Sequence, residues 1–197
     1  MLNWVTRVTQ KFEDRAIGSN MIYRLLQRYY KAPVENELVL GNITSRDHVL
    51  CIGGGICPLS AILFSQATGA KVTVIDNNPH CIPKAKKIIQ RVGLSDRVQV
   101  LHQDGADTDI DFSPYTVVHL ALQVAPLDRV LATVEKNIAP GTRLLVRRPK
   151  TRLKGMYCKL SQRLLSGCPY TSHSLCNIGT TLLYVKEDVK EAEKEVA

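Results

Sequence analysis

Short apolar runs alternate with helix-like segments along most of this chain, and this alternation limits the possible folds more than any other feature. Helix-like segments lie at 58–67, 79–92 and 127–137. Strands alternating with helices predict a mostly parallel sheet with helices on both faces. We therefore expect a doubly wound α/β fold. Its five strands are expected at 49–52, 71–75, 97–101, 115–122 and 143–147.

The segment before the first strand is predicted to be helical. Apolar side chains recur every three to four residues over 21–29, which is the spacing of an amphipathic helix. We expect Ser19 or Asn20 to cap this helix and Pro33 to end it. A second short helix is expected over 34–40.

The end of the chain is predicted to add antiparallel strands to the sheet. Strand-like runs at 170–176 and 180–186 flank Asn177-Ile178-Gly179, a hairpin signal. Together with the five earlier strands they predict a mostly parallel seven-stranded sheet that a C-terminal hairpin closes. The expected organisation is an N-terminal helical extension or lid at 1–45, a main domain at 46–186 and a charged tail at 187–197.

Composition excludes two classes of protein. Hydrophobic residues make up 45% and charged residues 22%, which suits a folded domain rather than a disordered chain. No apolar run approaches the roughly 18 residues that cross a bilayer. The N-terminus lacks the apolar core of a signal peptide, so we expect a cytoplasmic protein without a membrane partner. The six cysteines lack C-x-x-C spacing, and we expect free thiols and no metal site.

Positive charge is concentrated in the second half of the chain. The formal net charge is +8, and no Asp or Glu occurs between Glu135 and Glu187. Such a segment indicates an anionic partner, either nucleic acid, a phosphate or a substrate with several carboxylates. A solvated face of a basic protein is the alternative.

A glycine turn follows the first strand. Gly53, Gly54 and Gly55 stand between the run 49–52 and the helix that begins near Pro58. Glycines there allow a tight turn and let a ligand approach the backbone, with helix N–H groups beyond. A tight turn without a ligand is the alternative.

Two acidic residues follow the next strands. Asp76 ends the second strand, before Asn77, and Asp104 comes just after the third, before Gly105. A carboxylate at the end of the second strand can accept hydrogen bonds from both ribose hydroxyls, and ligands of open α/β sheets bind at the carboxyl ends of strands. Asp76 could instead serve only as a helix cap.

This order of motifs resembles the class I S-adenosylmethionine (SAM)-dependent methyltransferases, including their P-G turn before the fifth strand, here at 138–141. The resemblance covers about residues 46–186 and implies a Rossmann-like fold with SAM as the cofactor. By position, Gly53 and Gly55 would line the methionine part of SAM, Asp76 the ribose and Asp104 the adenine. Gly54, Asn77 and Gly105 would complete the cofactor site.

The chain departs from that family at two places. Cys51 stands where the family often has an acidic residue, and Cys57-Pro58 replaces the usual third glycine. The first change removes a polar contact expected near the SAM amino group. The second also argues against a nicotinamide dehydrogenase, which would have glycine at Pro58.

A weaker resemblance points to the nicotianamine synthases. IGGGICPLS at 52–60 is similar to the glycine loop of that family, in which a P-L pair and a small hydroxyl residue follow the G-x-G turn. VHLA at 118–121 and APGTRLLVR at 139–147 also resemble later segments of the family. This resemblance implies transfer of the aminocarboxypropyl arm of SAM in place of its methyl group. The chain lacks room for the family's larger N-terminal helical domain.

The acceptor is expected beside the ends of strands four and five, under the N-terminal helices. We name Glu35, His119 and Tyr23 as catalytic candidates, although each could be purely structural. Arg147, Arg148 and Tyr157 are candidates for holding an anionic acceptor, because arginines bind carboxylates and phosphates at two points. The other polar side chains expected near this position are Tyr29, Tyr30, Glu37 and Gln123.

The sequence therefore predicts a SAM-dependent transferase, with methyl transfer to a small acceptor, anionic if the basic segment holds it, as the first hypothesis. Aminocarboxypropyl transfer, RNA methylation and a non-catalytic basic binding module are the alternatives.

Overall fold

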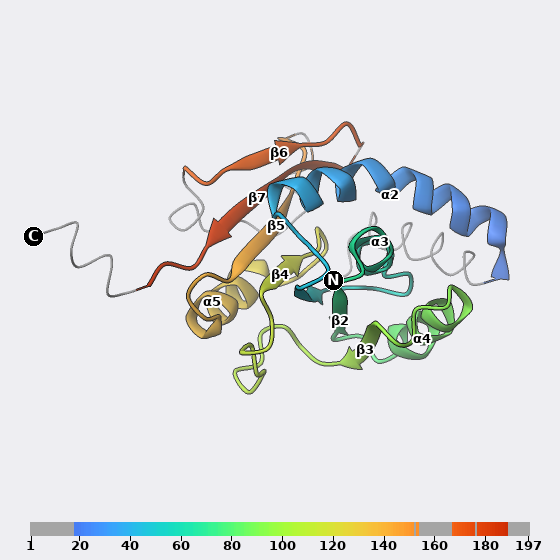
Figure 1. Ribbon diagram of the computed structural model, residues 1–197, viewed down its shortest axis with the longest axis horizontal. Helices are drawn as coiled ribbons and strands as arrows, with labels where there is room; N and C mark the ends of the chain where they lie inside the picture. The colour runs from blue at the N-terminus through green and yellow to red at the C-terminus, as the bar shows by residue number, and fades with distance from the viewer. Residues whose placement is uncertain (1–17, 152, 154–166, 176, 189–197) are drawn as a thin grey trace, which may run out of the picture.

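The computed structural model describes residues 18–151, 153, 167–175 and 177–188 of the 197-residue chain. One seven-stranded sheet runs through the molecule in the order β3-β2-β1-β4-β5-β7-β6 (Figure 1). β1 to β5 are parallel to one another, and β7 is antiparallel to both β5 and β6. This confirms the predicted mixed sheet with its closing hairpin. The strands are β1 (His48–Ile52), β2 (Lys71–Asp76), β3 (Val98–His102), β4 (Val117–Leu120), β5 (Arg143–Pro149), β6 (Tyr170–Ser172) and β7 (Ile178–Val185).

Helices cover both faces of the sheet, as the doubly wound prediction requires. On one face, α2 (Asn20–Leu40), α3 (Leu59–Thr68) and α4 (Cys81–Arg91) enclose a core that includes Val74 and Ile88. On the other face, α5 (Leu127–Asn137) packs through Leu131 on Leu50 and Leu144. Because successive strand residues point to opposite faces, β1 sends Cys51 to the first core and Leu50 to the second.

The prediction that Pro33 ends the first helix is wrong. α2 continues through Pro33 to Leu40, so the two helices expected before the sheet form one. A proline inside a helix costs about 3 kcal/mol through its missing N–H and its clash with the preceding turn. Burial on both sides offsets this cost, because Tyr23 lies in the core before Pro33 and Val34 lies in it after. The expected cap is present: Ser19 Oγ accepts the Ile22 N–H at 3.4 Å.

The remaining differences concern the ends of elements. β4 covers only the middle of the predicted run 115–122, because its pairing with β1 is limited to Val49–Ile52. β6 is three residues long, shorter than the predicted 170–176. Most of the charged tail and of the segment after β5 lies outside the described residues. Among the described helices, none has the length and apolar character that crossing a membrane requires.

Candidate functional site

The glycine turn after β1 adopts the conformation that its glycines permit. Gly53 and Gly55 have φ of 82° and 63°, in the left-handed region that side chains with a Cβ avoid. The Gly53 N–H donates to the Ile75 carbonyl at 2.9 Å, which ties the turn to the end of β2. The glycine pattern therefore reflects a real backbone requirement.

Two further glycines have no room for a side chain. A Cβ on Gly54 would lie 2.1 Å from Val74 Cγ1, and one on Gly105 would lie 2.5 Å from Ile52 Cγ2. Real Cβ contacts are not this short, so a side chain at either position would displace the core beneath it. The turns after β1 and β3 thus sit directly on buried strand residues.

The Asp76 carboxylate joins the ends of β1 and β2. Its Oδ2 accepts the Gly55 N–H at 2.7 Å, and its Oδ1 accepts the Asn78 N–H at 2.9 Å. Asp76 is half-buried, so the carboxylate is fixed in position without being sealed from solvent. Each carboxylate oxygen can accept more than one hydrogen bond, which leaves capacity for a ligand.

Asp104 occupies the equivalent place after β3. Its Oδ1 accepts the Ala106 N–H at 2.9 Å, and the residue is half-buried. Between the two acidic residues, His102 Nε2 lies 3.2 Å from the carbonyl oxygen of the exposed Asn77. Since β3, β2 and β1 are neighbours in the sheet, the turns after them lie along the same edge. The structure thus brings all seven predicted cofactor residues to the carboxyl edge of three adjacent strands.

A buried ion pair lies under α2, beside the same edge. Arg147 Nε and Nη2 each donate to one oxygen of Glu37, both at 2.7 Å. Thr181 Oγ1 donates to Glu37 Oε1 at 2.7 Å. Glu37 is fully buried and Arg147 is 4% exposed. Burial alone would raise the pKa of Glu37, but the Arg147 charge and then His119 hold it far below its usual range.

Two histidines border this pair. His119 Nε2 lies 3.6 Å from Glu37 Oε2, beyond hydrogen-bond distance, and its ring packs edge-on against Phe64. Burial and then the charge of Arg147 lower the pKa of His119, so it is held neutral. His173 Nε2 lies 2.8 Å from Thr181 Oγ1. His119 Nε2 and His173 Nδ1 are two of the four described buried side-chain atoms that have no hydrogen-bond partner, with the hydroxyls of Tyr23 and Ser65.

The strand register explains why these residues meet. Cys51 is paired with His119, and Arg147 with Thr181, so all four point to the face that α2 covers. Burial raises the pKa of the Cys51 thiol to about 12, which keeps it protonated and unreactive. This thiol stands where an acidic residue would have added a second buried carboxylate close to Glu37.

The other residues that the sequence suggests as catalytic or acceptor-binding candidates do not lie together. Tyr23 is buried in α2, and burial raises its pKa to about 12. Glu35 is exposed, and its Oε1 lies 3.7 Å from Lys31 Nζ. Arg148 and Gln123 are half-buried, and Tyr157 lies outside the described residues. Tyr30 lies beside the buried pair, with the Arg147 guanidinium 5.8 Å from its ring centre, and Tyr29 donates its hydroxyl to Asn177 Oδ1 at 3.2 Å.

Sequence analysis did not identify Thr181 and His173, because nothing in the hairpin distinguishes them from ordinary strand and turn residues. The Glu37–Arg147 pair does have a signal. Arg147 follows the apolar run Leu144–Val146 within β5, and Glu37 shares a helix face with Val34. Charges next to apolar patterns of this kind need partners when they are buried. Among the described residues, no group of three or more His, Cys, Asp or Glu could hold a metal ion.

Comparison with known proteins relates this arrangement to one family. The family described as nicotianamine synthase protein matches residues 27–170. The L-histidine 2-aminobutanoyltransferase of Yersinia pestis is 25% identical over 118 residues, which are 60% of this chain and 43% of that protein. The chain therefore aligns with less than half the length of this curated relative.

Solved structures show the same fold. MtNAS in complex with MTA and tNA superposes with a TM-score of 0.74 at 24% identity, covering 92% of this chain and 71% of that one. A glutamate-to-glutamine variant of MtNAS bound to S-adenosylmethionine superposes with a TM-score of 0.74 at 25% identity, covering 92% of this chain and 73% of that one. An RNA methyltransferase from Salinibacter ruber in complex with S-adenosyl-L-homocysteine superposes with a TM-score of 0.62 at 20% identity, covering 80% of this chain and 92% of that one. The family match spans well over half of the sequence, and the chain belongs to the nicotianamine synthase family.

Proposed function

We propose that this protein binds SAM at the carboxyl edge of β1, β2 and β3 and transfers the aminocarboxypropyl group of SAM to a small acceptor that carries an amine. Family membership supports this choice, as does the name of the Yersinia pestis relative, which specifies a 2-aminobutanoyl group and histidine. The sequence alone favoured methyl transfer, and the family match moves aminocarboxypropyl transfer ahead of it.

The observation that carries the proposal is the carboxylate-anchored glycine turn. Asp76 holds the Gly55 N–H at 2.7 Å and remains half-buried, so it offers fixed acceptor oxygens beside a turn whose backbone a ligand can approach. Asp104 offers a second carboxylate one strand further along the edge. Two carboxylates and a glycine turn suit a ligand that has a ribose diol, an adenine amino group and a chain ending in an amine. The residues present therefore fit SAM.

The acceptor side of the site is proposed under α2. The sulfonium of bound SAM activates the three carbons attached to it, so the protein must mainly orient the acceptor amine toward one of them. The Glu37–Arg147 pair fixes α2 against β5 and β7, and its two buried charges cancel. We propose that α2 acts as the lid of this site and excludes water from it.

RNA methylation is the second candidate. The basic stretch between Glu135 and Glu187 and the fold shared with the Salinibacter ruber enzyme favour it. The buried ion pair weakens this candidate, since Arg147 is neutralised by Glu37 and adds little to an exposed positive surface.

The test is a titration with SAM followed by analysis of the nucleoside products. The full chain is incubated with SAM and a mixture of amino acids and cell-extract metabolites, and the products are identified by mass spectrometry. Release of methylthioadenosine supports the proposal. Release of S-adenosylhomocysteine would establish methyl transfer instead, and absence of SAM binding would favour the non-catalytic basic binding module.

A further inference from the structure

Among the described residues, no strand pairs with the outer edge of β3. β3 is an edge strand, and within the described residues it pairs only with β2. The Arg97 carbonyl accepts from Val72 and the Gln103 N–H donates to Asp76, so odd-numbered residues direct their backbone groups toward β2. Alternation along the strand then directs the backbone N–H and C=O groups of Val98, Val100 and His102 toward the outer edge, while the side chains of the two valines stay in the core. Unpaired edge groups of this kind are a template for another strand.

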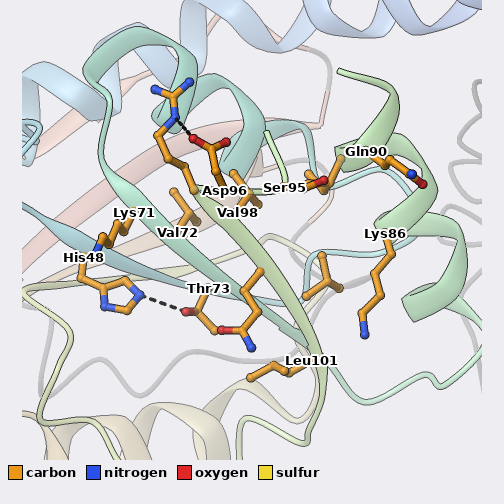
Figure 2. A pocket seen from close by; sticks show the side chains of 14 residues that line it. His48, Lys71, Val72, Thr73, Lys86, Gln90, Ser95, Asp96, Val98 and Leu101 are labelled. Carbon is orange, nitrogen blue, oxygen red and sulfur yellow. Dashed lines mark hydrogen bonds and ion pairs between the residues drawn. The ribbon is translucent and has the colours of Figure 1, made fainter. Parts of the chain in front are cut away.

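A hollow follows this edge. A pocket of about 650 Å³ is lined by β3, the start of β2 and one side of α4. Figure 2 shows its side chains spread along the strand, with Lys71 beside His48 at one end and Lys86 well away from them, and they do not converge on one point. This distribution suits an extended partner better than a small ligand. His48 is fixed by its contact with Thr73 Oγ1 at 3.0 Å.

We propose that a second copy of this chain pairs with β3 through its own β3, antiparallel about a two-fold axis at Val100. The outward residues are symmetric about Val100, so each pairs with an outward residue of the other copy. Val100 would exchange N–H and C=O bonds with Val100 of the second copy. The Val98 N–H is already donated to the Leu94 carbonyl at 2.8 Å. The Val98 carbonyl is the group expected to accept from His102 of the second copy.

The charges at the two ends of β3 favour an antiparallel partner over a parallel one. Lys71, Arg97 and Asp96 lie at its beginning, where their charges sum to a net positive charge, and Asp104 and Asp107 follow its end. In an antiparallel pair the basic end of each strand lies beside the acidic end of the other. Within the described part of the chain, Lys71 and Lys86 form no ion pair, whereas Arg97 has Asp96 at 3.6 Å. An interface of this kind is isologous and closes as a dimer.

Sedimentation equilibrium of the full chain over a wide concentration range tests the proposal. We expect a species of twice 21.9 kDa that dissociates on dilution and weakens at high salt. Val100→Pro should raise the dimer dissociation constant by at least about tenfold, because it removes the outward N–H, a loss that edge strands tolerate. It also replaces a buried side chain, so the fold of this variant must be checked. Val100→Ile, which keeps that N–H, is the matched control and should remain a dimer.

A second substitution covers the case in which Val100→Pro does not fold. Gln99 is exposed, and in the proposed pair it lies about 7–8 Å from its counterpart across the axis. Gln99→Lys should weaken the dimer at low salt and recover as salt rises, opposite to the wild-type trend, whereas Gln99→Met should not. A wild-type chain that stays monomeric would overturn the proposal, as would a folded Gln99→Lys variant that dimerises like Gln99→Met at low salt. An acidic peptide binding a monomer at β3 would replace the second copy with another partner.

Discussion

Glu37 and Arg147 form a two-point ion pair between α2 and β5, with both nitrogen–oxygen distances at 2.7 Å and both side chains buried. The pair spans 110 positions of sequence and fixes α2 on the sheet. Two buried opposite charges offset each other's desolvation only while both are present. Removal of one partner should therefore matter more than removal of both.

Arg147→Met should destabilise the fold by about 3–5 kcal/mol, because it leaves the Glu37 carboxylate buried without a counter-charge. The double variant Glu37→Leu with Arg147→Met should recover most of that loss. Urea unfolding monitored by circular dichroism measures both effects. Arg148→Met, at the half-buried neighbouring position, is the control and should change the free energy of unfolding little. If Arg147→Met and Arg148→Met lost the same free energy of unfolding, the assignment of Arg147 as the partner of a buried charge would be wrong.

Stability should fall in two stages as the pH drops. The pKa of His119 is lowered from 6.5 by burial and by Arg147, so the unfolded chain binds its proton first and stability declines below about pH 6.5. The pKa values of His48 and His173 are also lowered, mainly by burial. The pKa of Glu37 is also lowered, despite burial, so a further decline begins below its unfolded value of 4.5.

The measurement is the free energy of unfolding at a series of pH values. His119→Leu should reduce the slope of the free energy of unfolding against pH between pH 6.5 and 5, because a histidine that is buried in its neutral form contributes to that slope. An unchanged slope in His119→Leu would show that His119 is not the titrating group.

Asp76→Ala should weaken SAM binding by roughly 1–3 kcal/mol, because in the proposed site the ribose hydroxyls would lose a charged partner and the Gly55 N–H loses its acceptor. Isothermal titration calorimetry with SAM measures the change. Asp111→Ala is a close control, since Asp111 also accepts a backbone N–H two residues on, from Ser113, but lies in an exposed loop. If both variants bind SAM equally well, the ribose assignment is wrong.

Gly54→Ala should cost about 1–3 kcal/mol of stability, because its Cβ would lie 2.1 Å from Val74 Cγ1. The added Val74→Ala substitution removes that methyl group, and the double variant should lose less than the sum of the two single losses. Thermal unfolding of the four proteins forms the cycle. Gly18→Ala, where a Cβ meets nothing within 4 Å, should be neutral. Strict additivity of Gly54→Ala and Val74→Ala would show that the contact is relieved by other movements.

Local patterns in the sequence determined most of the sheet. The runs at 49–52, 71–75 and 143–147 are apolar enough to indicate buried strands, and α5 occupies the predicted 127–137. The turn after β1 was identifiable because a left-handed backbone needs glycine, at Gly53 and Gly55. These features follow from backbone conformation and periodicity, which act over a few neighbouring residues.

Only the tertiary structure decided which distant residues meet. Pro33 carries a local signal to end a helix, yet core contacts on both sides extend α2 through it. The sequence predicts that Arg147 could hold an anionic acceptor. In the fold its guanidinium instead donates to Glu37, which lies 110 positions earlier in the chain. Such pairings depend on strand order and on the placement of α2 over the sheet. Long-range packing and desolvation set them, and neither leaves a periodic pattern in the chain.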